Sequence, residues 1–260
     1  MDAPGRPFRR YIALGDSSTE GLDDPNGRGG YRGWSERLAL HIARGQAAPL
    51  EYANLAVRGR STREVLEEQL APALALAPDF ATLFVGTNDV TAGRFDEERF
   101  AADFEAMQRS LRDAGSAVLS FTLPDLTPVM PLARFVRGRV LRMNERIRGC
   151  SAATGSLLVD FAAAPVTSDP RLWSEDRIHA NSLGHERMAA ALAEAIGLVG
   201  HGGWEEPLGP AERRSLAARA GTELGWWTRH FVPWIGRSLT GKTSGDGLEP
   251  KYPCPIVVSD

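Results

Sequence analysis

The chain has 260 residues, of which 43% are hydrophobic and 24% charged, a composition typical of a globular protein that buries a full core. The net charge of -3 and a pI near 6.0 exclude the electrostatic pattern of a nucleic-acid-binding protein. Cys150 and Cys254 are the only cysteines, too few for a disulfide framework or a cysteine-rich zinc site. Residues 1–10 lack an apolar leader, and no apolar run reaches 18 residues. We therefore expect a cytoplasmic protein without a transmembrane segment, cofactor or metal.

The first predicted strand, residues 11–14, runs directly into the turn Gly15-Asp16-Ser17. Ser17 is then presented at the carboxyl end of a strand, where open α/β sheets place their chemistry. Asp16 is expected to hydrogen-bond within its own loop. Residues 21–33 form a loop rich in Gly and Asp that lacks the spacing of a calcium loop, so we interpret it as solvated.

Strands and helices alternate through the next 170 residues. A capping box, Ser61 with Glu64, begins a helix that is predicted to run through Leu70. Gly59 lies in the loop before it, and Asn88 follows the apolar strand 80–85. The remaining predicted strands are 51–57, 117–123 and 156–161, and the remaining predicted helices are 34–44, 96–114, 133–154 and 182–198.

This alternation predicts an α/β fold, in which a doubly wound parallel sheet of five strands lies between two helix layers. We assign this domain to residues 1–200. Residues 201–260 form a predicted appendage, in which an amphipathic helix precedes an extended tail that begins near Gly236. The helix carries Trp226, Trp227, Phe231 and Trp234. They are expected to pack on the protein's own domain, with a lid over an acyl pocket, a homodimer contact and a lipid-facing surface as alternatives.

Residues 236–243 match the phosphate-binding pattern G-x-x-x-x-G-K-[ST]. That pattern binds phosphate only between a strand and a helix, because loop and helix N–H groups hold the anion. Gly and Pro follow it here, so no helix can begin. We interpret it as a chance match.

Four loops at the carboxyl edge of the predicted sheet carry Ser17, Gly59, Asn88 and the pair Asp176 and His179. Acyl transfer by a serine needs a base, a carboxylate that orients the base, and donors for the oxyanion. Asp176 and His179, three residues apart in one loop, fit a carboxylate that orients a base. The backbone N–H groups of Ser17 and Gly59 and the Asn88 amide fit the oxyanion donors.

The order Gly15-Asp16-Ser17, Asn54 with Gly59, Gly86-Thr87-Asn88-Asp89, and Asp176-Arg177-Ile178-His179 resembles the four sequence blocks of the GDSL/SGNH serine hydrolases. The resemblance covers roughly residues 8–198. It implies a flavodoxin-like three-layer fold and an esterase, lipase or acetylesterase activity. It also implies Ser17 as nucleophile, His179 as base, Asp176 as orienting carboxylate, and Ser17, Gly59 and Asn88 as the oxyanion hole. Two positions depart from the family pattern: Ser18 replaces the usual Leu, and Ala180 replaces the usual Pro.

Structural roles are alternatives for several of these residues. Asn88 closing a turn and His179 capping the last helix are as compatible with the pattern. His185 falls inside the predicted last helix, where packing is expected. Asp160, at a strand end, is made redundant by Asp176.

We expect hydrolysis of a small-molecule or lipid carboxylic ester through an acyl-Ser17 intermediate. Acyl transfer to an alcohol or amine acceptor by the same triad is one alternative. A non-catalytic scaffold on the same fold is the other.

Overall fold

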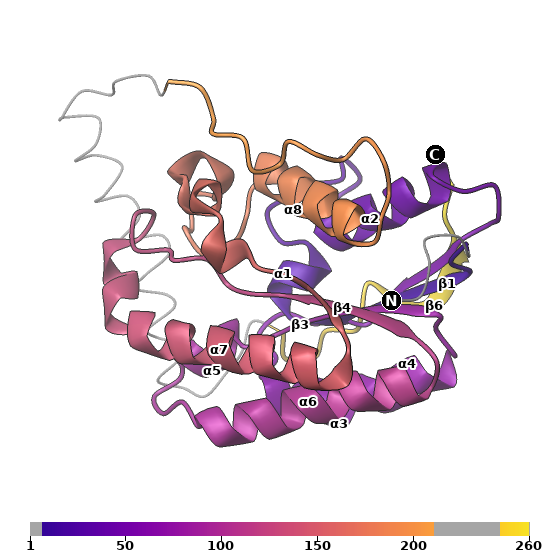
Figure 1. The fold of residues 1–260 in the computed structure, drawn as a ribbon, viewed down its shortest axis with the longest axis horizontal. Helices are drawn as coiled ribbons and strands as arrows, with labels where there is room; N and C mark the ends of the chain where they lie inside the picture. The colour runs from indigo at the N-terminus through magenta and orange to yellow at the C-terminus, as the bar shows by residue number, and fades with distance from the viewer. Residues whose placement is uncertain (1–6, 211–244, 260) are drawn as a thin grey trace.

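A computed structural model describes residues 7–210 and 245–259 of the chain. Its centre is a six-stranded sheet with the order β5-β4-β3-β1-β2-β6, covered by helices on both faces (Figure 1). The strands are β1 Arg10–Gly15, β2 Glu51–Asn54, β3 Phe80–Phe84, β4 Ala117–Phe121, β5 Leu157–Val159 and β6 Tyr252–Val257. This arrangement confirms the predicted α/β class, its three layers and its doubly wound order.

Strands β1 to β5 are parallel, and β1 and β3 form the buried middle of the sheet. All five residues of β3 are buried, and β1 is buried from Tyr11 onward. Their runs of apolar residues follow from this position, because a parallel strand covered on both faces has no solvent-facing side. Five carboxyl ends therefore lie along one edge of the sheet, the edge at which Ser17 follows β1.

Helices form one layer on each face of the sheet (Figure 1). The first layer contains α2 Gly33–Arg44 and α8 Ser182–Ala195; the second contains α3 Thr62–Glu68, α4 Leu70–Ala75, α6 Glu97–Asp113 and α7 Arg137–Thr154. The short helices α1 Ser17–Glu20 and α5 Thr87–Thr91 begin at the ends of β1 and β3. The 3₁₀ helices are η1 Pro131–Phe135, η2 Phe161–Ala163, η3 Pro165–Ser168 and η4 Pro170–Leu172.

The helix predicted to run from Ser61 through Leu70 is divided at Gln69 into α3 and α4. Its start is confirmed, because the Ser61 and Glu64 side chains form both bonds of a capping box. At the break, the buried amide of Gln69 accepts from the N–H of Gly15 at 2.9 Å and donates to its carbonyl at 2.8 Å. The division thus places a side-chain amide against the backbone at the end of β1.

The prediction of five strands is wrong, because the extended tail supplies a sixth. Strand β6 is the outermost strand beside β2 and pairs with it in antiparallel orientation, so the sheet is mixed. Lys251, just before β6, donates to the carbonyls of Tyr31 and Arg32 and forms an ion pair with Glu36 at 3.1 Å. Pro253 and Pro255 weakened the strand pattern in the sequence, but proline is tolerated in edge strands.

Several predictions concern residues outside the described part of the chain. The Trp-rich helix around residues 226–234 and the phosphate-binding pattern at 236–243 both lie there. The division into residues 1–200 and 201–260 accordingly stays a prediction. Within residues 7–210 and 245–259, no helix is both long and apolar enough to span a bilayer.

Candidate active site

Ser17 is the first residue of α1, directly after β1. The turn requires glycine at position 15, since a Cβ there would lie 2.2 Å from the carbonyl oxygen of Phe84 and 2.4 Å from Thr19 Oγ1. Asp16 caps α1 by accepting the N–H of Ser18 at 3.1 Å, as expected for a partner of its own loop. The strand, the glycine and the cap together fix the backbone that carries Ser17.

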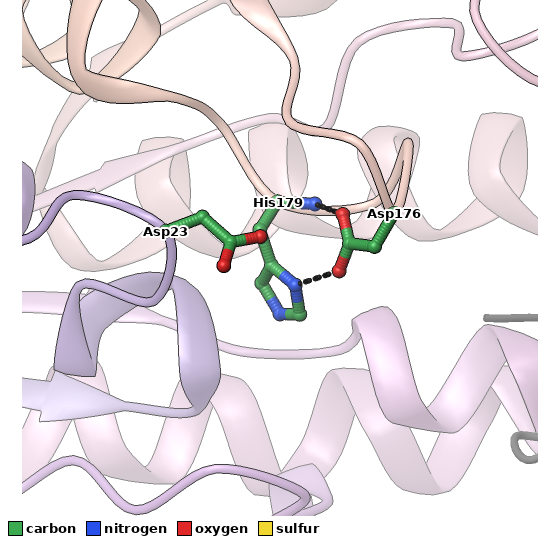
Figure 2. A group of neighbouring side chains, drawn as sticks. All are labelled: Asp23, Asp176 and His179. Atoms are coloured by element: carbon green, nitrogen blue, oxygen red, sulfur yellow. Dashed lines mark hydrogen bonds and ion pairs between the residues drawn. The ribbon is translucent and has the colours of Figure 1, made fainter. Parts of the chain in front are cut away.

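Asp176 and His179 lie in one tight loop before α8. Oδ1 of Asp176 accepts the backbone N–H groups of Ile178 at 2.9 Å and His179 at 3.0 Å, which folds the loop around the carboxylate. Asp176 Oδ2 lies 2.5 Å from His179 Nδ1 (Figure 2), and His179 Nε2 lies 2.7 Å from Ser17 Oγ. Ser17 and His179, 162 positions apart in the sequence, thus meet in one chain of hydrogen bonds.

The electrostatics of this pair favour a carboxylate beside a basic imidazole. Burial by itself would raise the pKa of Asp176, but the hydrogen bond and charge of His179 outweigh it and hold that pKa well below its usual range. Burial would lower the pKa of His179, but Asp176, followed by the charges of Asp23 and Asp16, raises it. The neighbouring carboxylates therefore make the neutral imidazole a stronger base, because they stabilise the imidazolium that forms when it takes a proton.

Asp23 is a further carboxylate at this site, and the sequence interpretation did not identify it. Figure 2 shows the His179 ring between the carboxyl groups of Asp23 and Asp176. The hydroxyl of Ser174 lies 2.6 Å from Asp23 Oδ2 and 2.6 Å from Asp176 Oδ1, so it links the two carboxyl groups. Asp23 has a φ of 65°, in the left-handed region that Asp tolerates better than most residues. The only available signal was its place in the acidic loop after Ser17.

One ligand-type atom from each of Asp23, Asp176 and His179 lies within 4.8 Å of the others, a spacing that a metal ion could also use. In the structure these three residues belong to a hydrogen-bond network instead, in which His179 Nδ1 faces Asp176 and Ser174 links Asp176 to Asp23. We assign no metal to this group.

The loop of residues 21–33 is exposed at residues 27–29, as its composition suggested, but it is buried at Asp24. Asp24 is 1% exposed, accepts the N–H of Gly33 at 3.1 Å and forms an ion pair with Arg37 at 2.7 Å. Pairing with the guanidinium compensates for the cost of burying this carboxylate. The loop therefore packs against α2 and holds Asp23 toward His179.

Gly59 and Asn88, the expected oxyanion donors, belong to adjoining segments. Gly59 has a φ of 81° in the loop after β2. Asn88, in α5, donates from Nδ2 to the carbonyl of Arg60 at 2.9 Å and faces Asp16 Oδ2 at 3.4 Å. Burial raises the pKa of Asp16 to about 7. The Asn88 amide is thereby tied to the loop that contains Gly59, and its role toward an oxyanion stays a prediction.

His185 and Asp160 have structural partners. His185 is fully buried in α8, where its Nδ1 accepts the N–H of Trp34 at 3.0 Å and its Nε2 faces the carbonyl of Leu22 at 2.9 Å. Asp160 forms an ion pair with Arg148 at 2.9 Å and accepts from Thr122 at 2.7 Å. Both contacts agree with the structural roles expected from their positions.

An apolar pocket opens beside Ser17 and His179. It extends to Phe121, Phe161 and Trp204. These three residues come from β4, η2 and the segment after α8, and no sequence motif marks them as neighbours. Only the fold brings them together.

Residues 13–187 match the GDSL-like lipase/acylhydrolase family. No curated protein sequence matches the chain. Among solved structures, the lipase/acylhydrolase from Enterococcus faecalis is similar, with 21% identity, a TM-score of 0.61, and coverage of 79% of this chain and 100% of that one.

A catalytic mutant of an acetylxylan esterase from Geobacillus stearothermophilus is 18% identical, with a TM-score of 0.59 and coverage of 73% of this chain and 94% of that one. The esterase EstA from Pseudoalteromonas sp., in a structure inhibited by monoethylphosphonate, is 16% identical, with a TM-score of 0.55 and coverage of 72% and 96%. At these identities the structures establish the fold, whereas the family match covers most of the chain. The protein belongs to the GDSL-like lipase/acylhydrolase family of hydrolases.

Proposed function

We propose that the protein hydrolyses a carboxylic ester through a covalent acyl intermediate on Ser17. The observation that carries the proposal is the continuous path of hydrogen bonds from Ser17 Oγ through His179 to Asp176, at 2.7 Å and 2.5 Å. With Nδ1–H held by Asp176, His179 has its Nε2 lone pair directed at the hydroxyl of Ser17.

In the first step Ser17 Oγ attacks the ester carbonyl carbon while His179 Nε2 takes its proton. The resulting imidazolium returns that proton to the departing alcohol oxygen as the bond from carbonyl carbon to alcohol oxygen breaks. In the second step His179 takes a proton from water, whose oxygen attacks the acyl-Ser17 carbonyl. Ser17 Oγ leaves with the proton from His179, and the acid is released.

The oxyanion formed in each step needs donors that are already oriented. We assign this role to the N–H groups of Ser17 and Gly59 and to Asn88 Nδ2. The hydrogen bond from Asn88 Nδ2 to the Arg60 carbonyl supports the assignment, because it restricts rotation of the amide. The other N–H of this amide faces Asp16 Oδ2, and at an Nδ2-to-Oδ2 distance of 3.4 Å that hydrogen bond is weak.

The test compares hydrolysis of p-nitrophenyl acetate and butyrate by the wild type, Ser17→Ala and Ser18→Ala. We expect Ser17→Ala to lose activity by at least about 10³-fold and Ser18→Ala to keep most of it. Monoethylphosphonate esters should modify the wild type once, at Ser17. Equal activity of the wild type and Ser17→Ala would contradict the proposal.

Transfer to an acceptor would use the same three residues. Product analysis with an added alcohol or amine distinguishes it from hydrolysis, because transfer yields the acceptor's ester or amide in place of the free acid.

A further inference from the structure

The apolar pocket beside Ser17 is built along the carboxyl ends of three neighbouring strands. Phe84 is the last residue of β3, Phe121 the last of β4, and Phe161 follows β5. Their rings are in contact, with centroids 4.0 Å apart for Phe84 and Phe121 and 5.2 Å apart for Phe121 and Phe161. The pocket therefore has an aromatic wall that leads away from β1 across the sheet.

Trp204 continues this wall. Its ring meets Phe161 edge to face at 5.5 Å. Two polar contacts hold the residue: its Nε1 donates to Glu194 at 2.7 Å, and Arg187 donates to its carbonyl at 2.9 Å. Arg187 also donates to the carbonyl of Glu206 at 2.5 Å. A large side chain held at both its backbone and its ring nitrogen is suited to form a fixed wall.

The lining offers little to a polar or charged ligand. Among the described residues that line the pocket there is no carboxylate, and the cationic side chains are Arg187 and, when protonated, His179. Nη1 of Arg187 donates to two backbone carbonyls, and the two ring nitrogens of His179 face Asp176 and Ser17. A hydrocarbon chain gains free energy from such a lining, whereas a sugar or a phosphate would lose hydrogen bonds with water.

The sheet order sets the length of the pocket. Ser17 follows β1 and Phe161 follows β5, and β1, β3, β4 and β5 are consecutive neighbours. Three strand spacings amount to about 14 Å, and an extended chain advances about 1.2 Å per bond, so roughly ten carbons reach from Ser17 to the far wall.

We propose that this pocket binds the linear acyl chain of the ester, up to about ten carbons, and that Trp204 forms its closed end. The inference rests on the proposed function, because Ser17 supplies the point of attachment. The acyl chain is the part of the substrate that stays bound to Ser17 after the alcohol leaves, so a pocket adjoining Ser17 holds it through both steps.

The experiment measures kcat/KM for two series of substrates. The first is p-nitrophenyl esters from acetate to palmitate, which vary the acyl chain; the second is acetate esters of linear alcohols, which vary the leaving group. We expect kcat/KM in the acyl series to rise about fourfold per methylene to a maximum near ten carbons and then to fall. The alcohol series should show little dependence on length.

Variants test the position of the wall. Trp204→Ala should move the maximum to longer chains by about four carbons, and Trp204→Phe should move it less, because the wall recedes in proportion to the ring that is lost. Val166→Phe, which adds volume to a lining residue, should move it to shorter chains. Val199→Ala, a fully surface-facing position in the same segment, should leave the profile unchanged.

The outcomes separate this inference from the proposed function. If Ser17-dependent hydrolysis of acetate esters occurs and kcat/KM does not rise with acyl length, the acyl pocket is refuted and the esterase function stands. A rise in the alcohol series alone also refutes it. An unchanged maximum in folded Trp204→Ala and Trp204→Phe refutes Trp204 as the end wall. Absence of any Ser17-dependent hydrolysis or phosphonate labelling refutes the function itself.

Discussion

Replacing Asp23 by Asn should lower the pKa of His179 and move the acidic limb of the pH profile to lower pH. The Asp23 carboxylate lies no more than 4.8 Å from a nitrogen of His179. At that distance the attraction between a carboxylate and an imidazolium is about 0.9 kcal/mol in water and about 3.5 kcal/mol at an effective dielectric constant of 20. Divided by 1.36 kcal/mol per unit, these limits give a decrease of about 0.6 to 2.5 in the pKa of His179.

The direction follows from charge alone. Asp23 favours the protonated imidazole, so its removal leaves the neutral base populated at lower pH. The titratable groups around His179 include Asp176, which pairs with Nδ1, Asp16 at the end of β1, and the neighbouring His185 of α8. None of these changes in the variant, and the Asn side chain still offers an oxygen to Ser174.

The assay is kcat/KM for a p-nitrophenyl ester from pH 4.5 to 9, which reports the pKa of the free enzyme. Glu105→Gln, which removes a half-buried carboxylate on α6, is the charge-matched control and should leave the profile in place. An acidic limb that stays fixed in Asp23→Asn, or moves to higher pH, would refute the electrostatic role of Asp23.

Three further predictions concern the triad, the turn and the buried imidazole. Asp176→Asn should reduce kcat by about 10⁴-fold while leaving the circular dichroism spectrum unchanged, because the tautomer of His179 is no longer fixed; a loss below tenfold would contradict this. Gly15→Ala should lower the free energy of unfolding in urea by about 1–3 kcal/mol or more, since its Cβ would lie 2.2 Å from a carbonyl oxygen; an unchanged midpoint would contradict the steric argument. Burial holds the pKa of His185 at about 4 in the folded protein, below its ordinary 6.5. The unfolded chain binds the extra proton between these values, so His185 should remove about 3 kcal/mol of stability as the pH falls from 6.5 to 4. Urea unfolding at pH 7 and pH 5 should show less of this loss in His185→Gln, and an equal loss in both proteins would exclude His185 as its source.

The sheet could be predicted from sequence because its strands carry local signals. β1 and β3 are continuous apolar runs, and the capping box at Ser61 specifies where α3 begins. β6 could not be recognised in the same way. Its sequence is interrupted by two prolines, and its stability comes from pairing with β2, about 200 residues earlier in the chain.

In the candidate site, too, the residues with local sequence signals could be predicted, whereas those positioned by distant contacts could not. Ser17, Asp176 and His179 follow recognisable blocks, and Asp176 and His179 are held together by a local turn. Asp23 is brought to His179 by tertiary contacts, and its loop is held by an ion pair between Asp24 and α2. The pocket depends on rings from separate strands, whose contacts exist only once the sheet has formed.

The edge strand β6 also determines how two molecules can approach each other. β6 pairs with β2 on one side only, and its register with β2 shifts between Tyr52 and Asn54, in the part of β6 that contains positions 253 and 255. Proline occupies both positions, so neither residue has an N–H to donate, and the irregular stretch offers a poor template for an incoming strand. This edge strand is therefore protected against edge-to-edge aggregation, in which the unpaired backbone groups of an exposed strand bind a strand of another molecule.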